Sequence, residues 1–109
     1  MNALSFSDHA LALPLLQELV DKVSFRIVVS IIDGAKNATQ ISLENQLPLS
    51  STYKKIRKLQ GMGMVLVEKI DIDDGGKKVL YYRSRIKSLE FNVTRDGVLL
   101  QFEKNDRQA

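Results

Sequence analysis

The chain has 109 residues, of which 44% are apolar and 27% charged, so it suits one modest hydrophobic core with little room for a second. It contains no cysteine, which excludes disulfides, zinc fingers and thiol catalysis and suits a reducing interior. No apolar run reaches the roughly 18 residues that a membrane span needs. The first residues also lack the basic stretch and cleavage site of a signal peptide. We therefore expect a cytoplasmic protein.

The net charge of +3 is unevenly distributed along the chain. Residues 1–53 carry three cations and five anions, whereas residues 54–109 carry 13 cations and eight anions, so the net charges are −2 and +5. Two segments, 54–58 and 77–87, contain cations and no acidic residue. Such separation of charge indicates a polyanionic partner.

The first third of the chain is expected to be helical after a disordered leader over residues 1–9. A leucine-rich stretch follows the leader and predicts a helix that is buried or faces a partner. Residues 25–32 are rich in β-branched side chains, which favour a strand. The nearby polar residues nevertheless recur at spacings of four, four and three, which place them on one helical face. We therefore predict a core helix that ends near Gly34.

The next segment has the order of a helix-turn-helix. Residues 37–40 have the pattern of a capping box, and the short helix after them should direct Ile41 and Leu43 inward. Pro48 favours a turn, and a basic helix is then expected over about residues 50–62, capped by a serine of its first turn. Three apolar residues of this helix form the predicted buried stripe. They are Tyr53, Ile56 and Leu59.

Two β-hairpins are predicted after Gly63. In the first, residues 73–76 form the turn, and Ile72 is expected opposite Lys77, which places Ile70 opposite Val79 and Asp71 opposite Lys78. In the second, alternating apolar residues lie on either side of a turn at Asp96 and Gly97. A two-residue loop there would place Val93 opposite Leu100 and Phe91 opposite Phe102. The second hairpin would have one apolar face that covers the core or meets another copy of the chain.

The residue pattern over 26–28, 39–42, 48–59 and 63–65 resembles winged helix-turn-helix transcription regulators. It is most similar to the ArsR/MarR-type proteins of archaea and bacteria, over roughly residues 22–86. The resemblance implies an α+β fold with a three-helix core and a β-hairpin wing over residues 10–87. Residues 88–104 would then form an additional C-terminal β-hairpin, and residues 105–109 a tail.

In that family, the helix at about residues 50–62 enters the major groove of double-stranded DNA, and the wing at 73–78 lies on the flanking backbone. The resemblance therefore implies a sequence-specific DNA-binding transcription regulator. The side chains implied at the DNA are Ser51, Thr52, Lys54, Lys55, Lys58, Lys77 and Lys78. The lysines would neutralise phosphates, whereas Ser51 and Thr52 are short enough to reach base edges. Arg57 could instead point away from the DNA.

Other chemistry finds little support in the sequence. The chain has one histidine and no cysteine, so no metal site and no cofactor are expected, and nothing pairs a nucleophile with a base as in an enzyme. The leucine-rich helix, the spare apolar hairpin and the symmetry of half-site recognition predict a homodimer. Two alternatives stay open. They are a winged-helix module that binds another protein of the transcription machinery, and a winged helix that binds RNA.

Overall fold

The computed structural model describes residues 3–6 and 9–105, and within them the chain forms four helices and two three-stranded antiparallel sheets. The helices are α1 (His9–Leu19), α2 (Lys22–Ser30), α3 (Ala38–Glu44) and α4 (Leu49–Gly61). One sheet, of order β2-β4-β3, contains β2 (Lys36–Asn37), β3 (Val65–Ile72) and β4 (Lys78–Ser84). The other, of order β1-β6-β5, contains β1 (Ala3–Phe6), β5 (Ile86–Thr94) and β6 (Gly97–Lys104).

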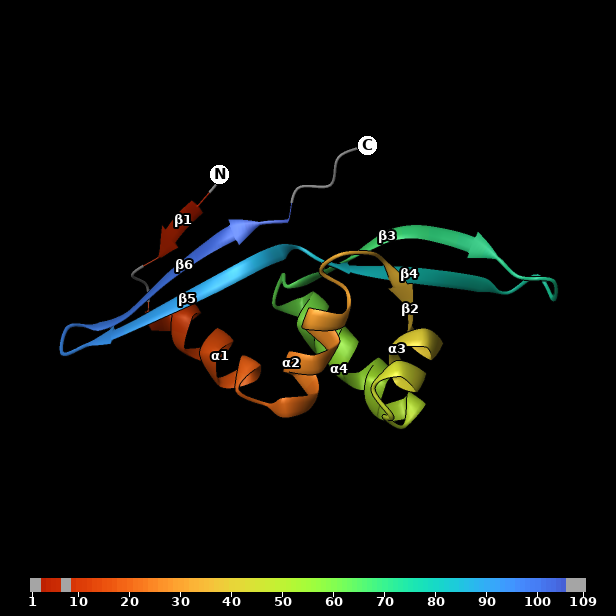
Figure 1. Ribbon diagram of the computed structural model, residues 1–109, viewed down its shortest axis with the longest axis horizontal. Coiled ribbons are helices and arrows are strands. Elements are labelled where there is room, and N and C mark those ends of the chain that lie inside the picture. The colour runs from red at the N-terminus through yellow and green to blue at the C-terminus, as the bar shows by residue number, and fades with distance from the viewer. Residues whose placement is uncertain (1–2, 7–8, 106–109) are drawn as a thin grey trace.

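The helices lie on one side of two long hairpins, β3–β4 and β5–β6, which extend in opposite directions (Figure 1). The molecule is consequently elongated, measuring 54 × 32 × 20 Å. Its core lies where the two hairpins meet the helices, and it includes fully buried side chains from α2, α3, α4 and the start of the first hairpin. These are Ile27, Ile41, Ile56, Leu59 and Met64. The expected α+β class and the C-terminal hairpin are confirmed.

The β-branched segment is a core helix, α2, as its polar spacing predicts. The leucine-rich stretch before it does not run into α2, because Asp21 caps the new helix and accepts a hydrogen bond of 3.0 Å from the Ser24 backbone amide. Helix α2 ends at Ser30, before the expected stop at Gly34. Ile31 follows as its C-cap and is itself fully buried.

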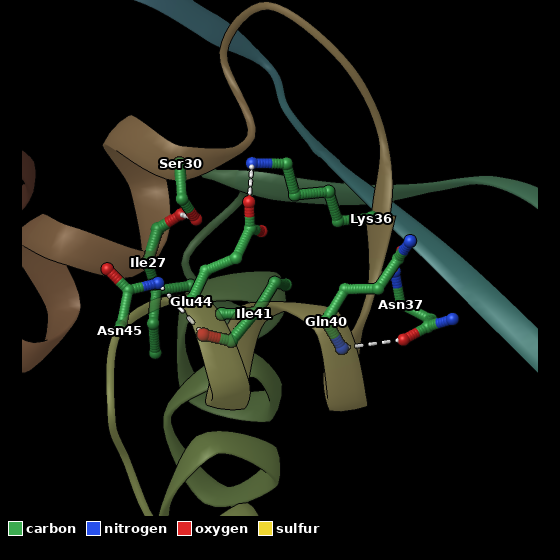
Figure 2. Close-up of polar contacts among 8 residues, drawn as sticks. All are labelled: Ile27, Ser30, Lys36, Asn37, Gln40, Ile41, Glu44 and Asn45. Carbon is green, nitrogen blue, oxygen red and sulfur yellow. Dashed lines mark hydrogen bonds and ion pairs between the residues drawn. The ribbon is translucent and has the colours of Figure 1, made fainter.

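Helix α3 begins with the predicted capping box, which Figure 2 shows. The Gln40 amide donates to Asn37 Oδ1 at 2.8 Å, and the Asn37 amide donates to Gln40 Oε1 at 2.9 Å. Lys36 Nζ lies 3.0 Å from Glu44 Oε1 and links β2 to the end of α3 (Figure 2). Ile41 is buried as expected, but Leu43 is 74% exposed, so the prediction that it points inward is wrong.

Helix α4 begins at Leu49, with Pro48 as an N-cap that makes no side-chain capping bond. The predicted serine cap is therefore wrong. Thr52 Oγ1 donates to the Pro48 carbonyl oxygen at 2.9 Å. The buried stripe is also shifted, because Thr52 is fully buried whereas Tyr53 is 42% exposed. An α-helix has about 3.6 residues per turn, so the steps of four and three from Thr52 through Ile56 to Leu59 stay on one face of the helix. The two steps of three from Tyr53 through Ile56 to Leu59 move progressively around the helix.

The β3–β4 hairpin has two registers. Near the helices, Val65 lies opposite Ser84 in the predicted register, but an irregularity between Val67 and Lys69 shifts the remaining pairs by one residue. Ile72 consequently lies opposite Lys78 rather than Lys77. The other two predicted pairs are wrong for the same reason, since Ile70 lies opposite Leu80 and Asp71 opposite Val79.

The tip of this hairpin explains the shift. The Asp73 amide donates to the Lys77 carbonyl oxygen at 2.9 Å, which leaves Asp74, Gly75 and Gly76 as the loop. Gly76 has a φ of +82°, the left-handed conformation that closes a three-residue loop of this kind.

The β5–β6 hairpin also turns one residue earlier than expected. Thr94 pairs with Gly97, so Arg95 and Asp96 form the turn, and the Asp96 amide donates to Thr94 Oγ1 at 3.2 Å. Val93 therefore lies opposite Val98, and Phe91 opposite Leu100, which corrects both predicted pairs. The shift is two residues along the partner strand, so the same apolar side chains still share one face.

The N-terminal segment differs from the expected disordered leader over residues 1–9. Ala3–Phe6 pairs with β6, with Ala3 opposite Glu103 and Phe6 opposite Leu100, and α1 begins at His9. The rest of the predicted leader, residues 1–2 and 7–8, lies outside the described residues, as does most of the predicted tail. A strand this short gives no periodic signal, and its partner lies at the other end of the sequence.

Candidate nucleic-acid interface

Helix α4 exposes one polar face, opposite the buried stripe that anchors it. Ser50, Lys54, Arg57 and Gly61 recur at spacings of four, three and four, and all four residues are exposed. Ser51 is exposed beside them in the first turn. Within the described residues, neither Lys54 nor Arg57 forms an ion pair. This arrangement, which we call the α4 polar face, offers cations and short hydroxyl side chains to a partner.

Two of the three lysines expected to contact DNA from α4 are bound to carboxylates of the same chain. Lys55 Nζ lies 3.1 Å from Asp21 Oδ2 and 3.4 Å from Glu18 Oε2. Lys58 Nζ lies 2.8 Å from Glu18 Oε1. The segment 54–58 contains no acidic residue, but the fold brings Glu18 and Asp21 next to it. The side chain of Lys58 is still 61% exposed, whereas that of Lys55 is 29% exposed.

The acidic partners are held in their charged forms. A hydrogen bond from Lys58, followed by one from Ser24, keeps the pKa of Glu18 below its ordinary value of 4.5, although burial opposes this. The Ser24 backbone amide, and then Lys55, lower the pKa of Asp21. Asp21 in turn raises the pKa of Lys55. Glu18 is only 6% exposed, so this cluster joins the end of α1 to α4 as part of the folded structure.

Thr52, which we expected to reach base edges, is fully buried, and its hydroxyl is bonded to Pro48. That expectation is therefore wrong for the folded chain. Tyr53 occupies the exposed position instead. The sequence already contained the signal for this exchange, because only Thr52 continues the spacing of four and three through Ile56 and Leu59.

Tyr53 faces a groove between α4, the start of α3 and the β3–β4 hairpin. We call it the α4–hairpin groove; its volume is about 440 Å³, and its lining includes Thr39, Tyr53, Lys77, Lys78 and Tyr82. Burial raises the pKa of the Tyr82 hydroxyl, and the proximity of Tyr53 adds to this effect. The groove therefore brings α4 and both predicted hairpin lysines around one depression.

Lys77 and Lys78 lie at the tip of the hairpin, and both are exposed. Asp73 shapes the tip by accepting hydrogen bonds from the Gly75 amide at 2.9 Å and from the Lys77 amide at 2.8 Å. In the part of the chain that the structure describes, neither lysine is paired with a carboxylate. The hairpin therefore adds two available cations to those of the α4 polar face.

Within residues 3–6 and 9–105, no group of three or more His, Cys, Asp or Glu side chains could hold a metal ion. Over the same residues, no helix is long and apolar enough to cross a lipid bilayer.

A solved structure similar to this chain is the solution NMR structure of a homodimeric winged helix-turn-helix DNA-binding domain from Mycobacterium bovis, described as a possible ArsR-family transcriptional regulator. The TM-score is 0.51, the sequences are 18% identical, and the match covers 72% of each chain. No protein-family model and no curated protein matches the chain. The structural similarity shows that the fold resembles a winged helix.

Proposed function

We propose that this chain is a sequence-specific double-stranded DNA-binding transcription regulator in which α4 is the recognition helix and the β3–β4 hairpin is the wing. The observation that carries the proposal is the α4 polar face beside Lys77 and Lys78, on a fold that resembles a winged helix. Lys54 and Arg57 on the helix, and the two lysines on the hairpin, have no acidic partner among the described residues. Such cations suit a surface of phosphates.

The two parts of the interface would have different tasks. Lys54, Arg57, Lys77 and Lys78 neutralise phosphates and release counterions, which supplies affinity with little sequence information. Ser50 and Ser51 in the first turn of α4 are placed to meet base edges in the major groove. Lys58 could exchange Glu18 for a phosphate, because most of its side chain remains exposed.

The proposal includes a homodimer, as in the Mycobacterium bovis domain. Several large apolar side chains are exposed, including Val20 just after α1 at 73%, Phe25 of α2 at 54% and Val93 of β5 at 72%. A groove of about 340 Å³ that includes Val20 and Phe25 is lined almost entirely by apolar residues, with Lys87 and Ser88 at its β5 side. An exposed apolar region of this kind is typical of a surface that another chain covers. A two-fold dimer would present two α4 helices to two half-sites.

The experiment that tests DNA binding is a fluorescence-anisotropy titration with duplex fragments selected from genomic DNA, repeated at several salt concentrations. Affinity should fall with salt with a log–log slope of about 4 for each bound chain, since about four cations of each chain meet phosphates. Preference for an RNA hairpin over the duplex in direct competition would favour the RNA-binding alternative. Absence of duplex binding at physiological salt would favour a module that binds another protein.

Light scattering of the wild type and of Phe25→Glu tests the dimer. The wild type should have the mass of two chains, and the variant the mass of one, because a charge in an apolar interface is strongly unfavourable. Leu43→Glu, a change at an exposed leucine of α3, is the matched control and should remain dimeric. A monomeric wild type at high micromolar concentration would contradict the dimer and leave DNA binding to be judged by the titration.

A further inference from the structure

A third cavity lies between α1, the end of α4, the start of β3 and the end of β6, beside the core residues Met64 and Ile86. Its volume is about 480 Å³, within the range of small-molecule sites. Leu15 of α1, Met62 and Met64 after α4, and Leu100 and Phe102 of β6 give it an apolar lining. The apolar lining therefore suits a ligand with an apolar part better than an inorganic ion.

The polar part of this lining is basic. Arg85 and Lys104 line the cavity and are exposed, and within the described residues neither forms an ion pair. No acidic side chain of residues 3–6 and 9–105 lines it. Arg85 and Lys104 would therefore both attract an anionic group bound between them, and no carboxylate of the described lining would compete for these two cations.

A third cation lies behind this wall. Arg83 is only 13% exposed; it contacts Glu68 at 3.4 Å and donates to Asn105 Oδ1 at 3.4 Å, and Asn105 itself lines the cavity. Among the residues that the structure describes, the buried Nε atom of Arg83 has no hydrogen-bond partner. Arg83 and Glu68 do not line the cavity and offset each other's charge, so the positive charge that favours a negatively charged ligand comes from Arg85 and Lys104.

We propose that this cavity binds a small organic carboxylate with an apolar body. The apolar body would lie against Leu66, Leu100 and Phe102, and the carboxylate would lie between Arg85 and Lys104. Such a ligand would also contact Met62 and Gly63, the residues through which the chain leaves α4. This site is separate from the α4 polar face, so it stands whether or not the chain binds DNA.

The test uses octanoate as the probe and octanol as its uncharged counterpart, with titration calorimetry and amide-resonance NMR on the full chain. Wild type should bind octanoate about tenfold more tightly than octanol, because the charged hydrogen bonds are available only to the carboxylate. The double variant Arg85→Gln/Lys104→Gln should lose this difference and keep the weak binding of octanol. The matched control Lys22→Gln/Arg95→Gln removes two exposed cations that do not line the cavity and should behave as wild type.

A further variant, Leu66→Trp, fills the cavity from β3 and should weaken both ligands, while dispersed amide resonances report that it is folded. Equal affinity of wild type for octanoate and octanol would overturn the proposal. Unchanged octanoate binding by Arg85→Gln/Lys104→Gln would overturn it as well. So would resonance changes confined to the apolar groove near Phe25 and Leu89.

Discussion

The Nζ atom of Lys58 lies 2.8 Å from Oε1 of Glu18, and this ion pair ties the proposed recognition helix to the end of α1. Glu18 also accepts hydrogen bonds from Ser24 and Lys55, so one nearly buried carboxylate joins three helices. The same lysines that give α4 its basic composition therefore also hold α4 in place. The positive charges of Lys55 and Lys58 therefore stabilise the fold, and any contact of these lysines with phosphate would use the same charges.

Glu18→Gln should lower the free energy of unfolding by about 1–2 kcal/mol, because hydrogen bonds to charged groups contribute on that order. Thermal denaturation followed by circular dichroism measures this change. Glu44→Gln removes the acid of an exposed ion pair and should have little effect. Equal melting temperatures for Glu18→Gln and wild type would show that the cluster does not stabilise the fold.

The cluster should also make stability depend on pH on the acid side. The pKa values of Glu18 and Asp21 are lower in the folded chain than their ordinary values of 4.5 and 3.8. The folded state therefore binds fewer protons than the unfolded state, and stability is present above these ordinary values and lost as the pH falls through the lowered ones. Melting temperatures should decrease from pH 5 to about pH 3. The decrease should be smaller in Glu18→Gln/Asp21→Asn, and an identical decrease would contradict the assignment.

The wing lysines should contribute affinity without specificity. Lys77→Ala/Lys78→Ala is expected to reduce the log–log salt slope of duplex binding by about 2 for each bound chain and to weaken selected and unrelated sequences alike. Anisotropy titrations on both kinds of duplex measure the two effects. The control Lys22→Ala/Arg95→Ala removes two exposed cations outside the proposed interfaces, and its slope should match wild type. A selective loss for one sequence would indicate base readout by the wing.

Thr52 should affect folding and leave DNA recognition unchanged. Thr52→Val removes the hydrogen bond to Pro48 at the start of α4 and keeps the buried shape, so stability should fall by about 1 kcal/mol. Duplex affinity, compared at a temperature where both proteins are folded, should equal that of wild type. The duplex affinity of Ser51→Ala is the comparison, because Ser51 is exposed on the same turn and is proposed to contact base edges. Loss of recognition by Thr52→Val alone would mean that this turn opens when DNA binds.

Local patterns predicted local structure well. The polar spacing from Lys22 to Ser30 outweighed strand propensity because α2 buries one face against the core, and the capping box at Asn37 depends on residues three apart. The hairpins were also predicted, but their pairs were not. The irregularity near Glu68 and the turn at Thr94 each change the register without changing the alternation of side chains that the sequence displays.

The candidate site was predicted less well, since it depends on contacts between distant segments. Lys55 pairs with Glu18, which is 37 residues away, and no pattern within α4 indicates this contact. Thr52 and not Tyr53 is buried, because helical geometry decides the buried stripe and the apolar character of tyrosine does not. Arg57 lies with Lys54 on the exposed side of α4.

The central claim is that the α4 polar face meets DNA, and charge reversal at that face tests it most directly. Lys54→Glu/Arg57→Glu should weaken duplex binding at least about tenfold at low salt, because two phosphate contacts become repulsive. Lys22→Glu/Arg95→Glu changes the net charge equally at two exposed residues outside the proposed interfaces and should retain most of the affinity. Equal affinities of wild type and Lys54→Glu/Arg57→Glu would contradict the account.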